Sequence, residues 1–510
     1  MLAKVFSGTT VGLTATLIEV EVDIPNEGLP AFNIVGLPDK AIEESKERVR
    51  AAIKNSGADF PIARITVNLA PADLPKNGPS YDLPIALGIL IASGQLTCKI
   101  DNSLFIGELS LDGSLRHTNG ILPLAYLAKE KKFKSIFVPR VNEKEASVVP
   151  GVDVFPVENL LQLVRFFLGT GKIEKARKRS LKSLLRISEA EFDFSEVVGQ
   201  EFVKRALEIA AAGNHNVFMK GTPGSGKTML ARALPGILPR LTEGESLEVT
   251  KIYSITGNLS DKEAIITTRP FRSPHHTTSR IGLIGGGSNI SPGEVSLAHR
   301  GVLFLDEFPE FPRHVLESLR QPMEDGKVSI SRAKGTVVYP AQFLLVAASN
   351  PCPCGYYGDP KRACKCMPGT ILRYNQRISG PILDRIDIHI DVPSVETQKL
   401  VSDKGKGESS NEIQKRVQKA RDIQIKRFKG KRIKSNSEMT TKDVKEYCPL
   451  SYECRTMMLS AAASMNLSAR SYFKVVKIAR TIADLEGSKE IFVKHLAEAL
   501  QYRPHLDESF

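Results

Sequence analysis

Residues Gly221-Thr222-Pro223-Gly224-Ser225-Gly226-Lys227-Thr228 fit the spacing G-x-x-x-x-G-K-[ST] of a phosphate-binding loop. The flanking sequence agrees, because Asn216–Met219 is typical of a strand and Met229–Leu234 is typical of a helix. Glycines let backbone N–H groups close around phosphate oxygens at the positive end of the following helix. Lys227 can reach the β- and γ-phosphates, and the Thr228 hydroxyl can bind Mg²⁺. The segment therefore predicts an α/β domain that binds ATP with Mg²⁺.

A second apolar segment, Val302–Leu305, ends in the carboxylates Asp306 and Glu307. A buried strand that ends in acidic residues suits metal binding at the edge of a parallel sheet. We expect Asp306 to hold Mg²⁺ through its water shell and Glu307 to polarise the attacking water. A third expected strand, Phe343–Ala348, leads to Asn350, which is placed to orient that water. The alternative for Asn350 is a turn-forming asparagine before a proline.

Three further strings carry a family resemblance: Arg272–Thr277 (RSPHHT), Asn350–Gly355 (NPCPCG) and Ser379–Asp387 (SGPILDRID). They are similar to the magnesium-chelatase-like branch of the AAA+ ATPases, and specifically to the competence protein ComM/YifB family. The likeness covers essentially the whole chain. It implies an AAA+ P-loop core over 192–395 and a C-terminal helical lid domain with a basic insertion over 396–510. It also implies that Val198, Gly199 and Gln200 form the segment that packs on the adenine.

The resemblance gives roles to two arginines. Arg385 resembles the arginine finger that reaches the γ-phosphate of a neighbouring subunit, and Arg470 resembles the second sensor on the helical lid. A guanidinium can neutralise charge spread over phosphate oxygens in the transition state. The alternative for either arginine is a surface salt bridge. An arginine finger that acts on a neighbouring subunit implies a ring. Members of the family are hexameric. They are described as DNA helicases that promote branch migration during natural transformation.

Two insertions fit a ring that holds DNA. Ala264–Ile290 is a glycine-rich extension, and the pattern of Val328–Tyr339 predicts a hairpin with Arg332 and Lys334 at its tip. A basic hairpin tip that points into the pore could grip phosphates and move with the nucleotide state. Without the resemblance, an ordinary turn is the alternative.

The region 1–168 predicts a separate α/β domain. Val11–Val22 and Ala63–Leu69 are rich in the β-branched and apolar residues of strands, and Ile42–Lys54 has helical spacing. We also expect a helix over Pro123–Lys132, followed by a short buried strand over Phe133–Pro139.

Two segments of this region, Pro75–Ser80 and Gly107–Gly113, resemble motifs of Lon-type proteases. The resemblance implies a Lon-protease-like (ribosomal protein S5 domain 2-like) fold. Lon chemistry needs a serine that is activated by a lysine amine, but Leu122 stands where that lysine should be. Three other lysines lie too far along the expected helix: Lys129, Lys131 and Lys132. We therefore expect Ser80 to be structural and the domain to serve as a non-proteolytic scaffold or a DNA-facing platform.

The charge of the chain favours an acidic partner. The chain has 510 residues, enough for about three domains, and a formal net charge of +13 at pH 7. One basic run lies in an expected linker over 169–191, and a second, over Lys415–Lys434, lies in an expected amphipathic helix. Such a balance favours DNA as a partner, and a solvated basic surface is the alternative.

Several absences in the sequence predict a cytoplasmic protein with no membrane partner. No run of about 18 apolar residues predicts a membrane-spanning helix. The N-terminus lacks the apolar core and the cleavage site of a signal peptide. Seven cysteines, an odd number, do not fit an extracellular disulfide framework.

Four of the cysteines form two C-x-C pairs: Cys352, Cys354, Cys364 and Cys366. Four thiolates in one short loop could bind Zn²⁺ tetrahedrally, although each pair is spaced more tightly than the usual C-x₂-C. Free or transiently oxidised cysteines are the alternative.

Three functions remain open on the sequence. The leading hypothesis is an ATP hydrolase and DNA helicase: a homo-hexameric motor on single-stranded or branched DNA that drives branch migration in transformation or recombination. The second is a magnesium-chelatase-type ATPase that remodels a protein partner. The third, an ATP-dependent Lon-like protease, is weakened by the missing lysine.

Overall fold

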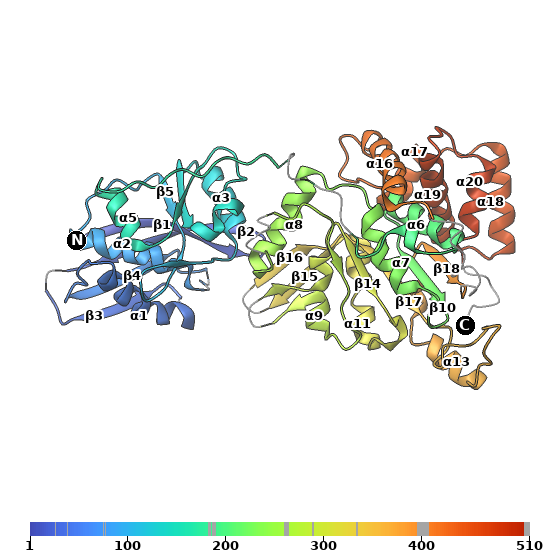
Figure 1. Ribbon diagram of the computed structural model, residues 1–510, viewed down its shortest axis with the longest axis horizontal. Helices are drawn as coiled ribbons and strands as arrows, with labels where there is room; N and C mark the ends of the chain where they lie inside the picture. The colour runs from blue at the N-terminus through green and yellow to red at the C-terminus, as the bar shows by residue number, and fades with distance from the viewer. Residues whose placement is uncertain are drawn as a thin grey trace. The chain divides into compact units, whose positions relative to one another are not determined.

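The computed structural model describes residues 1–510 except 26, 38, 75, 77, 182–184, 186–189, 260–264, 288–289, 333–334, 395–406 and 504–510. The chain divides into two compact units (Figure 1). The first comprises Met1–Leu184 together with Ser246–Ile266, and the second comprises Leu185–Glu245 together with Thr267–Phe510. Each unit has buried apolar clusters of its own. The first unit therefore includes part of helix α8 (Glu243–Thr256), which follows the phosphate loop in the sequence.

The first unit is built on a mixed seven-stranded sheet. In spatial order its strands are β3 (Ala31–Val35), β4 (Arg64–Ala70), β2 (Thr14–Asp23), β1 (Leu2–Val11), β5 (Ser103–Phe105), β8 (Ser135–Pro139) and β9 (Asp153–Val157). β1 and β2 form a long antiparallel hairpin, whereas β5, β8 and β9 run parallel to β1. Besides part of α8, this unit contains the helices α1 (Lys40–Asn55), α2 (Asp82–Ala92), α3 (Ile121–Glu130), α4 (Glu143–Ala146) and α5 (Leu160–Phe167).

Helices cover both faces of this sheet. Because successive strand residues point to opposite faces, Phe137 of β8 joins the apolar cluster of α1, α2 and α5. Its neighbours Ile136 and Val138 join the cluster of α3 and α4 instead. A sheet buried on both sides explains why β8 reads as a continuous apolar run.

Most of the expected elements of this unit are confirmed, including the strand at β4 and the helices at α1 and α3. The strand expected over Val11–Val22 is wrong at its start. Gly12 has a left-handed φ of 60° in the turn between β1 and β2, so the second strand begins at Thr14. β1 was not anticipated, since its own residues give weaker strand signals than those of β2.

The second unit contains a five-stranded parallel sheet. Its spatial order is β11 (Phe271–Arg272), β14 (Val302–Leu305), β17 (Leu344–Ser349), β10 (Val217–Gly221) and β18 (Ile388–Val392). β14 and β17 are buried along their whole length, as central parallel strands are. The strands expected at Asn216–Met219, Val302–Leu305 and Phe343–Ala348 are thus confirmed to within a residue or two.

A set of C-terminal helices packs into the same apolar cluster as this sheet. They are α16 (Ser410–Arg427), α17 (Thr441–Tyr447), α18 (Tyr452–Ser464), α19 (Ala469–Leu485) and α20 (Val493–Leu500), drawn in orange and red in Figure 1. This confirms a helical C-terminal region. Helix α6 (Glu201–Gly213) contributes to the same cluster and contacts both α16 and α19.

Among the helices of the described residues, none combines the length and the apolar character that a bilayer crossing requires.

Candidate nucleotide site and cysteine cluster

The phosphate loop connects β10, which ends at Gly221, to α7 (Lys227–Ala233). Gly224 and Gly226 have left-handed φ angles of 78° and 89°, which glycine adopts without steric cost. A Cβ at Gly221 would lie 2.5 Å from the carbonyl oxygen of Val392 in β18. Glycine is therefore required where the loop passes the neighbouring strand.

Lys227 is held inside this loop. Its Nζ donates to the carbonyl oxygens of Gly221 at 2.6 Å and Thr222 at 3.0 Å, and to Oδ1 of Asn350 at 3.2 Å. Burial lowers the pKa of Lys227, and the carboxylate of Asp306 only partly opposes that effect. The oxygens of a bound phosphate could replace these carbonyl oxygens as acceptors for the Lys227 ammonium group.

The two groups expected to hold Mg²⁺ lie together. The Thr228 hydroxyl donates to Oδ2 of Asp306 at 2.8 Å, and the backbone N–H of Glu307 donates to Oδ1 of the same carboxylate at 2.9 Å. Hydroxyl and carboxylate oxygens are hard ligands that suit Mg²⁺. The residues present therefore fit the ion that the sequence predicts.

Glu307 has a contact that the sequence did not indicate. Its Oε2 lies 3.3 Å from Nδ1 of His276, whose ring packs on His275 with centroids 4.0 Å apart. These histidines follow β11, the strand next to β14, so the parallel sheet brings them to the edge where Glu307 lies. Glu307 itself has a left-handed φ of 50°. The string RSPHHT was recognised from the sequence, but this role of His276 in it was not.

Gln200, the last residue of the expected adenine segment, contacts the phosphate loop. Its Nε2 donates to the carbonyl oxygens of Ser225 at 2.6 Å and Pro393 at 3.1 Å. The expected adenine segment, with Val198 half-buried and Gly199 at a φ of 70°, thus adjoins the phosphate loop.

Three buried polar atoms near the loop have no hydrogen-bond partner among the described residues: Oε1 of Gln200, Oγ1 of Thr222 and Oγ of Ser225. Buried polar groups are normally satisfied, so such atoms fit a site that receives a polar ligand.

Arg385 and Arg470 do not lie at the phosphate loop of their own chain. Arg385 comes before β18 begins at Ile388, whereas the loop follows the end of β10. The two strands are parallel and pair from Val217 with Ile388 to Gly221 with Val392. The loop therefore lies at the carboxyl ends of these strands, and Arg385 lies at their amino ends. A strand length of about 16 Å separates the two.

The two arginines share one carboxylate. Arg385 Nη2 lies 2.7 Å and Arg470 Nη2 lies 2.5 Å from Oε1 of Glu324, in α12 (Arg320–Asp325). Hydrogen bonds from Arg385 first, and then from Arg470, lower the pKa of Glu324. Both arginines line a cavity of about 780 Å³, together with Glu324, Lys474 and Lys477. The cavity thus has four cationic side chains that could take a phosphate group, and four carboxylates also line it: Glu324, Asp325, Asp387 and Glu438.

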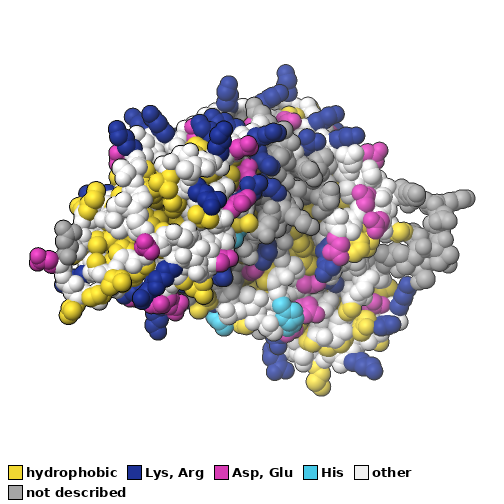
Figure 2. Space-filling view, turned by 60° about the vertical axis from the view of Figure 1, so that its left-hand side comes forward, with side chains coloured by type: hydrophobic (Ala, Val, Ile, Leu, Met, Phe, Trp, Pro, Cys, Tyr) yellow, Lys and Arg dark blue, Asp and Glu magenta, His cyan; other side chains and the backbone are white. Residues whose placement is uncertain are grey.

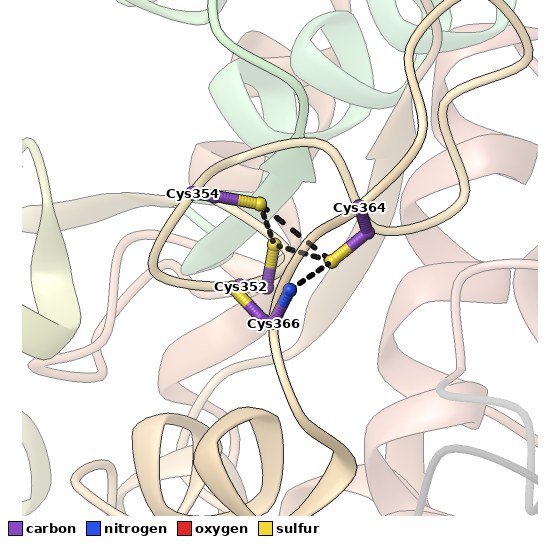
Figure 3. A group of neighbouring side chains, drawn as sticks. All are labelled: Cys352, Cys354, Cys364 and Cys366. Atoms are coloured by element: carbon purple, nitrogen blue, oxygen red, sulfur yellow. Dashed lines mark hydrogen bonds between the residues drawn. The ribbon is translucent and has the colours of Figure 1, made fainter.

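The four clustered cysteines converge (Figure 3). The sulfur of Cys352 lies 3.3 Å from that of Cys354 and 3.7 Å from that of Cys364, and the last two are 3.6 Å apart. With Cys366 included, all four sulfur atoms lie within 4.8 Å of one another. The cluster could therefore hold a metal ion.

A protein of Haemophilus influenzae named competence protein ComM is 43% identical over 504 residues, which cover 98% of this chain and 97% of that protein. The chain belongs to the ComM/YifB family. The protein YifB of Escherichia coli is 42% identical over 504 residues, with the same coverage. The family resemblance expected from the sequence is thereby confirmed.

Domain families of magnesium chelatase match most of this ComM/YifB-family chain. The family described as magnesium chelatase, subunit ChlI, matches residues 193–400. A second ChlI family matches residues 20–142, and the ChlI C-terminal family matches residues 407–503. The magnesium-chelatase 38 kDa subunit of Rhodobacter capsulatus is 28% identical over 178 residues, which cover 31% of this chain and 50% of that protein. Membership of this AAA+ family implies ATPase activity.

The hairpin expected in this ComM/YifB-family chain is present. β15 (Lys327–Arg332) and β16 (Gly335–Pro340) pair antiparallel, with Arg332 opposite Gly335. Ala333 and Lys334, at the expected tip, lie outside the described residues. The hydroxyl of Tyr339 donates to the carbonyl oxygen of Ile290 at 3.0 Å, so the hairpin contacts the glycine-rich extension.

The position expected for a Lon-type lysine is apolar. Leu122 is fully buried in the cluster of α3 and α4. The lysines farther along are all exposed: Lys129, Lys131 and Lys132. Ser80 lies in a short 3-10 helix, Pro79–Tyr81, and its carbonyl oxygen accepts from Gly107. The Lon-like fold of this unit stays a prediction.

Proposed function

We propose that this chain is an ATP-driven hexameric motor that acts on single-stranded or branched DNA, as a branch-migration helicase in transformation or recombination. One observation supports a ring-shaped assembly. The phosphate loop and Arg385 lie at opposite edges of one sheet, so a complete site needs a second subunit. The name of the ComM relative, a competence protein, supports DNA as the substrate.

The chemistry follows from the side chains at the loop. Lys227 would bind the β- and γ-phosphates, while Thr228 and Asp306 would hold Mg²⁺. When bound, Mg²⁺ neutralises charge on the phosphate oxygens. Glu307 would take a proton from the attacking water, and Asn350, already in contact with Lys227, would orient that water.

Arg385 and Arg470 would both act on the nucleotide of a neighbouring subunit. They line one cavity with Lys474 and Lys477, at the edge of the sheet that lies away from their own phosphate loop. A γ-phosphate that enters this cavity would compete with Glu324 for both guanidinium groups. Hydrolysis in one subunit would then depend on the position of the next.

The contacts to DNA are assigned to whole elements of the chain. The hairpin of β15 and β16 would face the pore, and Arg332 is exposed near its tip. Lys and Arg side chains are spread over the face in Figure 2, mixed with Asp and Glu, so surface charge alone does not mark one DNA path. The N-terminal domain, assigned to 1–168 with a basic linker over 169–191, would be a non-proteolytic, Lon-like scaffold or DNA platform.

We also propose that the four cysteines bind Zn²⁺. Metal analysis of the purified chain is expected to give close to one zinc, and less than about 0.3 zinc per chain would contradict the proposal.

The proposed function is tested by ATPase assays alone and with single-stranded, duplex and four-way branched DNA. The Lys227→Ala variant is the control, since it is expected to lose nucleotide affinity. Branched or single-stranded DNA should raise the rate of the native chain. If DNA neither binds nor stimulates hydrolysis at moderate salt, the proposed motor on DNA is wrong.

A second candidate is a chelatase-type ATPase that remodels a protein partner. The match of residues 193–400 to the magnesium chelatase subunit ChlI favours it. It predicts an ATPase rate that does not change with DNA in the assay above and that increases when a protein partner is added.

A further inference from the structure

We propose that the cysteine loop, defined here as Pro351–Met367, is a metal-dependent support of the phosphate loop. Zinc held by the four thiolates would set the affinity of the chain for nucleotide. The inference rests on the zinc and the ATP binding proposed above, and adds a coupling between the two sites.

The sulfur geometry suits one small tetrahedral ion. Zn–S bonds of about 2.3 Å place the four sulfur atoms of a tetrahedron about 3.8 Å apart. The sulfur distances of 3.3, 3.6 and 3.7 Å among Cys352, Cys354 and Cys364 lie close to that value. An iron–sulfur cluster would spread the thiolates farther, since each binds a different iron.

The loop also supplies charge for such a centre. Zinc with four thiolates carries two negative charges, and three cations lie between or beside the cysteines: Lys361, Arg362 and Lys365. Backbone N–H groups point at the sulfurs as well. Tyr357 donates to Cys352 at 3.3 Å, and Cys366 donates to Cys364 at 3.4 Å. Such bonds orient metal ligands and strengthen their binding.

The cysteine loop touches the phosphate loop directly. A Cβ at Gly355 would lie 2.5 Å from Cγ and 2.7 Å from Cδ of Pro223, so the backbone at Gly355 packs directly against the proline ring. A second connection runs through Asn350, which immediately precedes the cysteine loop and accepts a hydrogen bond from Lys227 at 3.2 Å.

The thiols bring the two ends of this segment together, while Asp359 orders its middle by accepting from the backbone N–H groups of Lys361 and Arg362. Residues 351–367 contain no helix or strand, although all of them are described. Cys352 is fully buried, so the first thiol is fixed against the domain while the others close the loop around it. A segment of this kind takes its order from the metal, and loss of the metal is expected to release Pro223 and Asn350.

The first experiment uses the full-length chain. Zinc content is measured, together with the Kd for a fluorescent ATP analogue, before and after treatment with a zinc chelator. The chelator is removed and Mg²⁺ restored before binding is measured. We expect removal of zinc to raise the Kd about tenfold, and added zinc to restore it. Cys98→Ser, outside the cluster, should leave zinc content and Kd unchanged.

Two glycines in the cysteine loop give a matched pair of variants. Gly355 and Gly358 have left-handed φ angles of 85° and 77°, so alanine adds similar backbone strain at each. Only Gly355 has a neighbour within 4 Å of the added Cβ. Gly355→Ala should keep its zinc but raise the nucleotide Kd several-fold, whereas Gly358→Ala should match the native chain.

The outcomes distinguish the proposed coupling from the two proposals on which it rests, the zinc site and ATP binding. If zinc is present but neither its removal nor Gly355→Ala changes the nucleotide Kd, the coupling is overturned and the zinc site stands. If the native chain holds no zinc, the zinc proposal fails and the coupling fails with it. Binding of ATP is judged separately, by comparison with Lys227→Ala.

Discussion

Glu324 accepts ion pairs from Arg385 and Arg470 through the same carboxylate oxygen, at 2.7 and 2.5 Å. All three side chains are at least partly exposed, so each pair is worth at most about 1 kcal/mol. That is weak enough for a phosphate to displace it. Glu324 would therefore hold both arginines ready without blocking them.

Removal of this carboxylate charge should favour the phosphate. Glu324→Gln is expected to raise kcat/KM for ATP about two- to fivefold, because one competitor for the guanidinium groups is weakened. Steady-state ATPase kinetics measure this. Glu317→Gln, which breaks the neighbouring pair with Arg320, is the control and should change little. A lower kcat/KM would show instead that Glu324 positions the arginines for catalysis.

Glu307 is expected to be the water-activating base. Glu307→Gln should bind ATP normally but hydrolyse it at least about 100-fold more slowly, since the amide cannot take a proton. Binding is measured with the fluorescent analogue, and turnover by phosphate release. Comparable turnover in this variant would remove Glu307 from its role.

The residues that could be predicted lie within short strings or at the ends of apolar strands. Lys227, Thr228, Asp306 and Asn350 belong to this class, and the parallel sheet brings them together as expected. The contacts that were missed depend on tertiary packing. Glu324 and Arg470 are 146 residues apart, and nothing in either local sequence indicates the pair.

At the scale of elements, helix α8 begins with a buried cluster of charge around Glu245. Burial raises the pKa of Glu245, but Arg269 and then Arg300 lower it more, to about 2. The carboxylate is thus ionised in the folded chain at a pH where it would be protonated when unfolded. Its contribution to stability is present above about pH 4.5 and is lost as the pH falls towards 2.

A variant can measure this contribution. Glu245→Gln is expected to lower the free energy of unfolding at pH 7 by about 3 kcal/mol, because it removes a buried carboxylate that offsets the charge of Arg269. Urea unfolding from pH 7 down to pH 2 tests the prediction, and the difference from the native chain should shrink below pH 4.5. Glu201→Gln, which changes an exposed carboxylate that pairs with Lys204, is the control.

The hairpin of β15 and β16 offers a test of DNA contact. Arg332→Ala, near the tip, is expected to reduce DNA-stimulated ATPase activity and the salt dependence of DNA binding, and to leave the basal rate unchanged. Lys327→Ala, exposed at the base of β15, removes an equal charge away from the tip. Equal losses in both variants would argue against a specific role for the tip.

The second basic run shows how far a charge pattern can mislead. It predicted a helix, and α16 is present, but several of its cations are used inside the fold. Arg421 donates to the carbonyl oxygen of Ala211 at 3.2 Å, and Arg427 pairs with Asp484 at 2.5 Å. Sequence patterns predicted the helix because they are local, whereas these acceptors come from distant segments.

For the whole molecule, the proposed ring predicts complementation between inactive chains. Arg385→Ala should keep nucleotide binding and lose hydrolysis, and Lys227→Ala should lose nucleotide affinity. Mixed rings would contain some junctions with an intact phosphate loop on one side and an intact Arg385 on the other. ATPase activity of the mixture should therefore exceed the sum of the two parts, and no recovery in a confirmed mixed ring would count against action on a neighbour.

The overall architecture could be predicted only in part. A mixed α/β chain with a parallel P-loop sheet and C-terminal helices follows from the octapeptide and the strands around it. The assignment of Ser246–Ile266 to the first unit does not, since that segment follows the phosphate loop in the chain and packs with α3 and α4. The return of the chain to the first unit depends on packing between distant segments. Patterns in a single sequence do not show such packing.

The placement of the phosphate loop and Arg385 at opposite edges of one sheet has a consequence for symmetry. A dimer with a two-fold axis would complete its sites only if one self-complementary patch held both the loop and Arg385, which lie about 16 Å apart along the strand. In the proposed ring, each head-to-tail contact would complete one site, so an open chain of n subunits would leave one loop and one arginine unused. Among head-to-tail assemblies, a closed ring would let every subunit both supply an arginine and receive one. ATPase activity per chain should therefore rise with protein concentration and level off once assemblies close.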